Sequence, residues 1–444
     1  MGDELFGDLP EQSGPTQEGT AGRPRLREPM RDQIELRSVD LDSVIGVDHP
    51  ARLFWAYVER LDLRVLEDSI KAREGRPGHP PATPRLLLAL WLYATSEGVG
   101  SARALARLCE SHDAYRWLCG GVSVNYHSLS DFRVGHGDLL DDLLSQHVAV
   151  LASAGLINFE TLVQDGIRVR ANAGAASFRR RTTLEQHLAT ARAVLEELKR
   201  EVDDDADASN RRIRAARQRA ARQRADRVEA ALKSLSEVEA QRKRREKKNA
   251  NQTKKQKEPR ASTTEPQARV MKMADGGFRP AWNLQVVSAA EKQIVLAVEP
   301  GNVGSDRGLL RPMLQAVRRR LGLIPKRHLA DGGFASAKDI EWAHDNGIEV
   351  YCPPTKAKHG RDPFLPRRND GPGVLAWRAR MASLEGQARY KRRAISECIH
   401  ARWRHWNLRF NVRGALKVRT LMLWHVLANN ILQGHHLARV AAPA

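Results

Sequence analysis

The stretch TLVQDGIRVRAN, from Thr161 to Asn172, alternates in polarity with the period of a β-strand. Asp165 falls on the same side of this strand as the apolar residues Val163, Ile167 and Val169. The opposite side carries Gln164, Arg168 and Arg170. Because an unpaired charge among apolar side chains is costly, Asp165 needs a metal ion, another cation or a polar site. A structural aspartate paired with an arginine meets the same need, and the strand alone leaves both interpretations open.

The sequence before this strand is helical in pattern. From residue 36 to residue 156, short apolar segments follow N-cap residues, with Thr83 before LLLALWLYA and Ser101 before ARALARLC. Short helices joined by small turns fit a DNA-binding helix-turn-helix domain and a plain helical bundle almost equally well. Residues 1–35 are rich in Gly, Pro, Glu and Arg, and we expect a disordered leader there.

A basic helical segment follows the strand, between residues 184 and 262. Apolar residues recur in it at steps of three and four, which predicts a helical hairpin or coiled coil and then a flexible linker. From Arg211 to Arg260 there are 19 Lys and Arg against 6 Asp and Glu, so this stretch supplies +13 of the net charge of +20. Such charge favours a polyanionic partner such as nucleic acid. A solvated charged helix is the alternative.

Strand and helix patterns alternate after the linker. Strands are expected at AWNLQVVSA, QIVLAVEP, RHLADGGF and IEVYC, with a helix that Ser305 caps and a second that begins at Ser336. Two long helices, about 383–405 and 412–435, close the chain. A three-stranded meander followed by strand-helix alternation predicts a ribonuclease-H-like α/β core formed by residues 157–183 and 263–440.

Three acidic residues are placed by this fold where phosphodiester chemistry would need them. Asp165 lies in the first strand, Asp331 ends a later strand before two glycines, and Glu397 lies on the closing helix. The two strands can be neighbours at the centre of the sheet. Carboxylates are ligands for Mg²⁺, and two metal ions can activate the attacking oxygen and stabilise the leaving one.

The closing helix, YKRRAISECIHARWRHW, carries one charged face. Tyr390, Arg393, Glu397 and Arg404 fall at offsets of 3, 7 and 14 residues, which is one side of an α-helix. An acid flanked by guanidinium groups suits a site that holds metal and clamps phosphate. An intrahelical ion pair between Arg393 and Glu397 is the alternative. We interpret His400 and His405 as helix-surface residues rather than ligands.

These segments resemble the motifs of DDE transposases of the insertion-sequence-four and -five clan. The helix resembles the family signature of Tyr390, Arg393, Glu397 and a basic residue, with Arg404 in place of the usual lysine. ADGGFAS, around Asp331, is similar to the second-aspartate motif, and QDGIRVRANAG to the first. WNLQ, at Trp282 to Gln285, resembles a further family strand, and the helical region from residue 36 resembles the domain that precedes the catalytic core.

The resemblance implies metal-dependent cleavage and strand transfer at insertion-sequence ends. Asp165, Asp331 and Glu397 would be catalytic residues and ligands of two Mg²⁺ (or Mn²⁺) ions. Tyr390, Arg393 and Arg404 would contact DNA. The expected partners are double-stranded DNA, both transposon ends and target, and a second copy of the chain in a homodimeric synaptic complex.

The organisation that follows has four parts. Residues 1–35 are the leader, 36–156 the helical DNA-binding domain, 157–183 with 263–440 the catalytic core, and 184–262 the basic insertion and linker. No membrane partner is expected because the chain has no long apolar run, so we expect a cytoplasmic, nucleoid-associated protein.

Other functions fit parts of the same sequence. A non-catalytic DNA-binding protein, such as an inactive transposase, would keep the basic charge and the helices. A ribonuclease-H-like nuclease would use the same carboxylates without joining DNA. A structural coiled-coil protein explains only the basic segment and leaves the two-period core without a role.

Overall fold

A computed structural model describes residues 38, 40–73, 75, 79–200, 208–248, 258–355 and 362–442. The leader expected at 1–35 and residues 249–257 of the expected linker lie outside the described residues. None of the helices in the described ranges is both long and apolar enough to span a membrane.

One mixed sheet is built around β1 (Thr161–Arg170), the strand with Asp165. β1 pairs antiparallel with β5 (Phe278–Ala289), whose far edge pairs with β4 (Arg269–Lys272) and β6 (Val295–Gly301). On its other side β1 pairs in parallel with β7 (Arg327–Ala330), and β7 pairs in parallel with β8 (Glu349–Tyr351). The four strands expected after the linker therefore form, and the strand that leads to Asp331 is a neighbour of β1, as expected.

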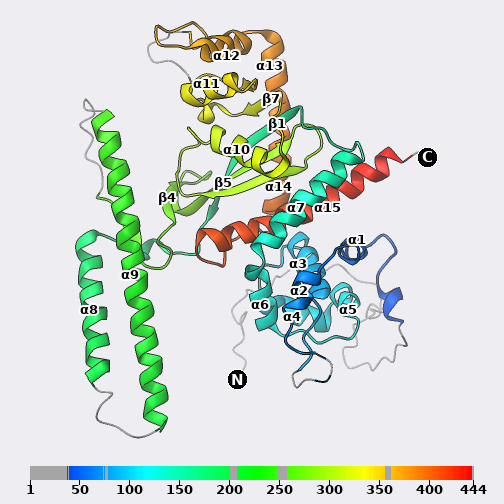
Figure 1. Cartoon of the computed structure of the whole chain (residues 1–444), viewed down its shortest axis with the longest axis vertical. Helices are drawn as coiled ribbons and strands as arrows, with labels where there is room; N and C mark the ends of the chain where they lie inside the picture. Colours follow the sequence, from blue (N-terminus) through cyan, green and yellow to red (C-terminus); the bar gives the residue numbers. More distant parts are fainter. Residues whose placement is uncertain are drawn as a thin grey trace, which may run out of the picture. The chain divides into compact units, whose positions relative to one another are not determined.

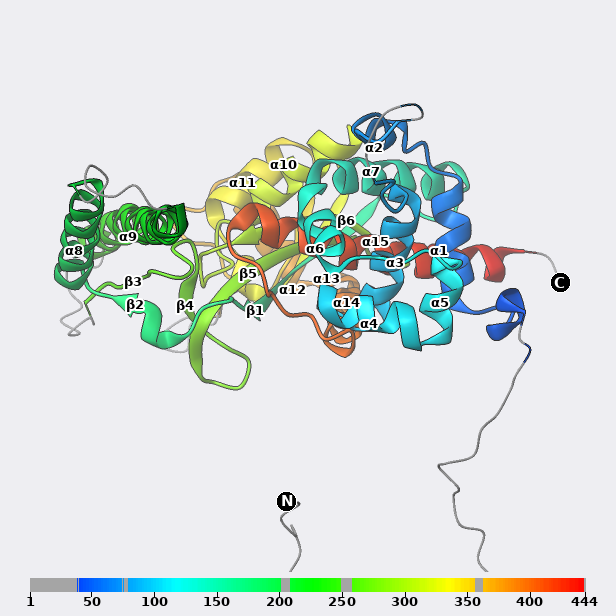
Figure 2. The ribbon, with the colours of Figure 1, turned by 90° about the horizontal axis from the view of Figure 1, so that it is seen from below.

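The two faces of β1 are covered by different helices. Gln164 donates a hydrogen bond to the Leu309 carbonyl oxygen, beside α10 (Leu310–Leu321), whereas Asp165 lies against α14 (Ile395–His405). Figure 2 shows α10 and α14 on opposite sides of the sheet. The predicted alternation along β1 is confirmed, although Gln164 is fully buried because the sheet is covered on both faces.

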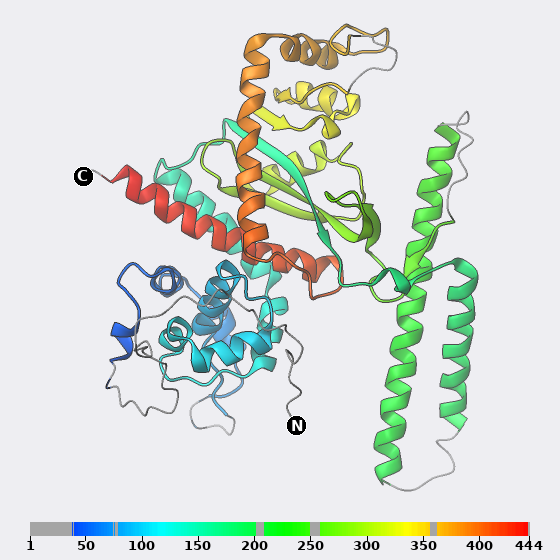
Figure 3. The ribbon, with the colours of Figure 1, turned by 180° about the vertical axis from the view of Figure 1, so that it is seen from behind.

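The helix expected at about 383–405 is interrupted. It divides into α13 (Leu384–Lys391), a 3₁₀ turn over Arg392–Ala394 and α14. Figure 3 shows α13 and α14 as one column that crosses the sheet. The tight turn changes the offset of Tyr390 from the α14 residues, because a 3₁₀ turn has fewer residues than an α-helical turn.

Two further helices follow the parallel strands. α11 (Ala337–Asp345) connects β7 to β8, and α12 (Pro372–Ala382) packs against α11 and β8. Ser336 is the N-cap of α11, as expected. The prediction that Ser305 caps a helix is wrong, since α10 begins at Leu310 after a turn in which the Ser305 hydroxyl accepts a hydrogen bond from the Arg307 amide.

Seven α-helices precede β1 in the described part of the chain. Thr83 and Ser101 cap the third and fourth of them, as expected, because each side chain accepts a hydrogen bond from the first turn. In chain order the helices are α1 (Pro50–Glu59), α2 (Arg64–Asp68), α3 (Pro84–Ser96), α4 (Ala102–Ser111), α5 (Asp113–Cys119), α6 (Tyr126–Gly135) and α7 (Gly137–Ser153).

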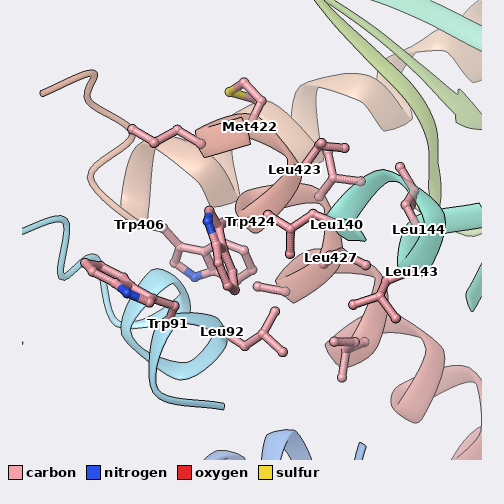
Figure 4. Packing of buried hydrophobic residues seen from close by; sticks show 14 of the residues in the cluster. Trp91, Leu92, Leu140, Leu143, Leu144, Trp406, Met422, Leu423, Trp424 and Leu427 are labelled. Carbon is pink, nitrogen blue, oxygen red and sulfur yellow. The ribbon is translucent and has the colours of Figure 1, made fainter. Parts of the chain in front are cut away.

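The last helix joins these helices to the sheet. α15 (Ala415–Ala441) packs against α7, α3 and β6, and its side-by-side course with α7 is visible in Figure 1. The shared apolar core in Figure 4 includes Trp91, Leu92, Leu140, Leu143, Leu144, Trp406, Met422, Leu423, Trp424 and Leu427. One continuous core therefore holds the helical region against the sheet.

Two long helices lie between β1 and β4. α8 (Arg181–Arg200) and α9 (Ala208–Lys248) run antiparallel, since Arg181 pairs with Glu239 and Arg192 with Glu229. Their contact buries Leu184 of α8 with Val228, Ala231 and Leu235 of α9. A small ladder of β2 (Phe178–Arg179) and β3 (Ala261–Ser262), which the sequence did not indicate, lies at their base.

Candidate active site

The register of β1 and β7 brings two of the expected acids together. Gln164 is paired with Ala330 in parallel register, so Asp165 and Asp331 are the next residues on neighbouring strands. Asp331 follows the last residue of β7 and caps the 3₁₀ turn Gly332–Phe334, where its Oδ1 accepts the Gly333 amide hydrogen at 2.6 Å. The carboxyl end of a central parallel strand is where open α/β sheets place their sites.

Asp165 is held by α14 and by its own backbone. Its Oδ2 accepts hydrogen bonds from Arg393 Nη1 at 3.0 Å and Ser396 Oγ at 3.1 Å, and its Oδ1 accepts one from the Gly166 amide at 2.8 Å. The side chain is only 15% exposed. The apolar stripe therefore holds a carboxylate whose charge is met by a cation, as the sequence requires.

Arg393 links Asp165 to Glu397. Its Nη2 lies 3.2 Å from Glu397 Oε1, so one guanidinium group forms the aspartate pair and the intrahelical pair that the sequence left open as alternatives. Burial opposes the charge of Arg393, but Asp165, Tyr390 and Asp331 outweigh it, and the pKa of Arg393 lies above its ordinary value. Arg393 is thus the cation among the three acids, and Glu397 extends from it toward solvent with 66% of its side chain exposed.

His400 is a correction to the sequence interpretation. It is buried, not at the helix surface, and its Nδ1 lies 3.8 Å from Asp165 Oδ2. Burial lowers the pKa of His400 even though the charge of Asp165 opposes this change. A neutral imidazole therefore lies beside the same Asp165 oxygen that accepts from Arg393 and Ser396. His405 is exposed, as expected.

The two remaining expected DNA contacts lie in different places. The Tyr390 ring is 5.9 Å from the Arg393 guanidinium carbon, in cation-π range, and so belongs to the acid cluster. Arg404 lies more than two turns further along the column and lines a separate groove. The residues predicted to share one helical face therefore lie on two neighbouring surfaces, with Tyr390 in the acid cluster and Arg404 in the groove.

Asp306 is a fourth acid, which the sequence analysis missed. Its Oδ1 accepts hydrogen bonds from Asn283 Nδ2 at 2.8 Å and Gln285 Nε2 at 2.9 Å, and a Cβ atom built on Gly333 would lie 3.8 Å from its Oδ2. Asp306 thus stands beside the turn that Asp331 caps. The WNLQ segment was the signal in the sequence that could have revealed this site. Its two side-chain amides, Asn283 and Gln285, lie among apolar residues and require polar partners.

A buried chain of hydrogen bonds connects Asp306 to the centre of the sheet. Gln164 donates to Gln285 at 3.0 Å, and His328 Nε2 lies 3.0 Å from the Gln164 side-chain oxygen. Burial lowers the pKa of His328 to about 3, so the neutral ring donates through Nε2. These contacts fix the polar side chains of β5, β1 and β7 in one arrangement.

The donor set fits a divalent cation by its chemistry, because carboxylate oxygens are the preferred ligands of Mg²⁺. As the side chains stand, no three His, Cys, Asp or Glu residues in the described ranges are grouped closely enough to hold one ion. One observation favours a cation site here. The cluster already holds a cation, since the Arg393 guanidinium is bonded to Asp165 and Glu397.

A groove of about 770 Å³ begins two residues beyond Asp165. Five arginines line it: Arg168, Arg170, Arg404, Arg409 and Arg413. All except Arg168 are exposed, and their guanidinium groups make no ion pair or hydrogen bond with a described side chain or backbone atom. These arginines come from β1, α14 and the segment before α15. The fold therefore brings together in one groove positive charges that lie far apart in the sequence.

Two family models match the chain. One, described as a Transposase domain (DUF772), matches residues 39–134, and the other, described as a Transposase DDE domain, matches residues 249–431. The second range includes Asp331 and Glu397, and Asp165 precedes it. Searches of curated proteins and of solved structures give no match.

Proposed function

Because this chain belongs to the DDE transposases of bacterial insertion sequences, we propose that Asp165, Asp331 and Glu397 hold the two divalent metal ions with which it cuts and joins DNA. Transposases of this family typically use divalent metal. The observation that carries the assignment is the register of β1 and β7, which supports Asp165 and Asp331 as neighbouring ligands. Bound Mg²⁺ or Mn²⁺ would activate the attacking oxygen and stabilise the leaving one.

Arg393 has two roles in this proposal. Without metal, it neutralises Asp165 and Glu397 and so keeps the acids from repelling one another. With the acids holding metal, the Arg393 guanidinium would be free to bind a DNA phosphate through its planar donors. Tyr390 stays beside it and limits the directions in which Arg393 can turn.

The arginine groove is the proposed path of DNA beside the acids. Its four unpaired guanidinium groups suit phosphates, which give affinity without sequence information. Arg404 is a DNA contact in this proposal, at the end of the groove.

The basic segment 184–262 is the proposed second DNA contact, inserted into the catalytic core. The surface of α9 carries exposed Arg217, Arg222 and Arg224. Replacing these three residues by Gln should reduce the slope of log K against log salt by up to about 0.9 for each phosphate that the variant no longer neutralises. An unchanged slope would make this face a solvated surface or a contact between protomers.

The remaining organisation is proposed as the sequence suggested. Residues 36–156 read DNA, and residues 157–183 and 263–440 carry the chemistry. Two transposon ends must be joined together, so we assign a homodimer to the synaptic complex. The protein acts in this proposal on nucleoid DNA in the cytoplasm.

Substitution of the acids tests the active site. Asp165→Asn, Asp331→Asn and Glu397→Gln should each abolish Mg²⁺-dependent cleavage and joining of a transposon-end duplex and leave DNA binding largely intact. Asp345→Asn, at an exposed acid that ends α11, is the matched control and should keep activity. Retained activity in any one of the three variants removes that residue from the site.

Product analysis separates the remaining functions. Joining of a 3′ end to target DNA is expected, whereas cleavage without joining would indicate a ribonuclease-H-like nuclease. DNA binding with neither product in Mg²⁺ or Mn²⁺ would indicate an inactive, DNA-binding member of the family.

A further inference from the structure

A second cavity, of about 400 Å³, lies between the start of α4 and the segment that follows α14. Gly100, Ser101 and Ala104 line it from the side of α4, and Asn407, Arg409 and Asn411 from the other. Its lining contains no Asp or Glu, and Arg133 faces it from α6. The cavity therefore brings hydrogen-bond donors and a cation together, and no carboxylate lines it.

Arg133 is a buried charge with only neutral partners. The residue is 6% exposed, its Nη1 donates to the Gly100 carbonyl oxygen and, at 3.1 Å, to Asn411 Oδ1, and its Nε has no partner in the described structure. The guanidinium carbon lies 4.6 Å from the centre of the Trp91 ring. Burial lowers the pKa of Arg133 to about 10, with no carboxylate to oppose the change.

Two other arginines with buried side chains are paired with carboxylates. Arg320 is bonded to Asp141, and Arg378 lies 2.6 Å from Asp370. Removing a charge from water is costly unless an opposite charge compensates. Arg133 lacks such a charge within the described protein, so an external anion would lower its free energy.

The amino end of α4 adds a second attraction for an anion. α4 is ten residues long, and Ser101 caps it by accepting a hydrogen bond from the Ala104 amide. The first-turn amides and the helix dipole of such a terminus favour phosphate. Arg409, which is exposed, lines both this cavity and the arginine groove beside the acids.

We propose that this cavity, the Arg133 pocket, binds one phosphate group of the DNA backbone through Arg133 and the first turn of α4. The inference rests on the proposed function for the source of the phosphate, since a strand in the arginine groove reaches the pocket at Arg409. A free phosphate ion has the same chemistry, so the experiment separates the two sources.

The test places an anion in the pocket by substitution. Asn411 is exposed and its Oδ1 already lies 3.1 Å from Arg133, so Asn411→Asp supplies a carboxylate without removing a buried side chain. Asn158→Asp is the matched control, because Asn158 is exposed, lies outside the pocket and accepts a hydrogen bond in the same way from the Glu160 amide. Both changes add one negative charge.

Two measurements follow, both in EDTA so that no cleavage is needed. Added inorganic phosphate at constant ionic strength should raise the Tm of the wild type and of Asn158→Asp by more than it raises the Tm of Asn411→Asp. Asn411→Asp should also lower the slope of log K against log salt for duplex DNA by about 0.9, the value for one phosphate.

The outcomes separate the parts of the proposal. An unaltered phosphate response and an unaltered salt slope in Asn411→Asp would overturn the pocket as an anion site. A smaller phosphate response in Asn411→Asp with an unchanged salt slope would support the pocket and overturn DNA as the source of the phosphate. Failure of the proposed function is a different result, which is read from wild-type cleavage assays in Mg²⁺.

Discussion

Replacing Arg393 tests whether the acid cluster is a cation site. Arg393→Gln removes the cation bonded to Asp165 at 3.0 Å and to Glu397 at 3.2 Å, and keeps much of the volume of the side chain. Breaking a buried pair costs about 3–5 kcal/mol and an exposed one about 0–1 kcal/mol. Since Arg393 and Asp165 are 18% and 15% exposed, we expect a loss of about 2–3 kcal/mol, nearer the buried limit.

The assay is thermal unfolding in EDTA and in Ca²⁺. Unfolding entropy is about 2.1 cal/mol/K per residue, so this loss corresponds to a decrease in Tm of about 2–3 °C in EDTA. Ca²⁺ should recover most of the decrease, because Asp165 and Asp331 then have a divalent partner. The variant should consequently gain more from Ca²⁺ than the wild type does.

Arg392→Gln is the control, since Arg392 neighbours Arg393 but pairs with Glu291 at the surface, with side chains 59% and 51% exposed. This pair is worth at most about 1 kcal/mol, so the control should change Tm by about 1 °C or less. An unchanged Tm of Arg393→Gln in EDTA, or equal Ca²⁺ responses in the variant and the wild type, would refute the view that Arg393 neutralises a metal site.

Three further predictions concern the core. In Gly166→Ala, the new Cβ would lie 2.7 Å from Asp306 Oδ1, so overpacking should lower the free energy of unfolding by about 1–3 kcal/mol. A urea titration that shows no such loss would mean that the Asp306 side chain moves aside to make room for the methyl group. His328 and His425 have pKa values lowered by burial to about 3 and about 4, so the stability present above pH 6.5 should fall by about 1.4 kcal/mol per pH unit and per histidine below it. Replacing either histidine by Gln should reduce that slope, and equal slopes in variant and wild type would contradict the assignment. Trp424→Ala should cost about 3–5 kcal/mol in chemical denaturation, because the ring is 1% exposed and its Nε1 donates to the Arg133 carbonyl oxygen; a loss below about 1 kcal/mol would show that the core collapses around the change.

The positions of the strands could be predicted because local patterns specify them. The alternation in residues 161–170 and the apolar run in 281–289 predict β1 and most of β5. The short ladder of β2 and β3 carries no such pattern, since two residues per strand are too few for a period. The helix at 383–405 was predicted as continuous because nothing in its composition marks the 3₁₀ turn at Arg392–Ala394.

The roles of charged residues were less accessible to sequence reasoning. Arg393 could be placed near Glu397 by helical spacing, but its bond to Asp165 joins residues 228 positions apart. Asp306 was missed because it lies in a loop, where no periodicity marks which side chains turn inward. His400 was placed at the surface because the helical pattern alone does not reveal that Asp165 lies beneath it.

The sequence by itself determined the period of each element, the excess of positive charge and the order of the acidic motifs, because these depend on residues close together in the chain. Only the tertiary structure decided that Arg393 serves two acids, that arginines from three segments share one groove, and that Arg133 is buried without an acid. The physical reason is that Coulomb and hydrogen-bond energies depend on distance and burial, which the packing of β1 against β7 and α14 sets.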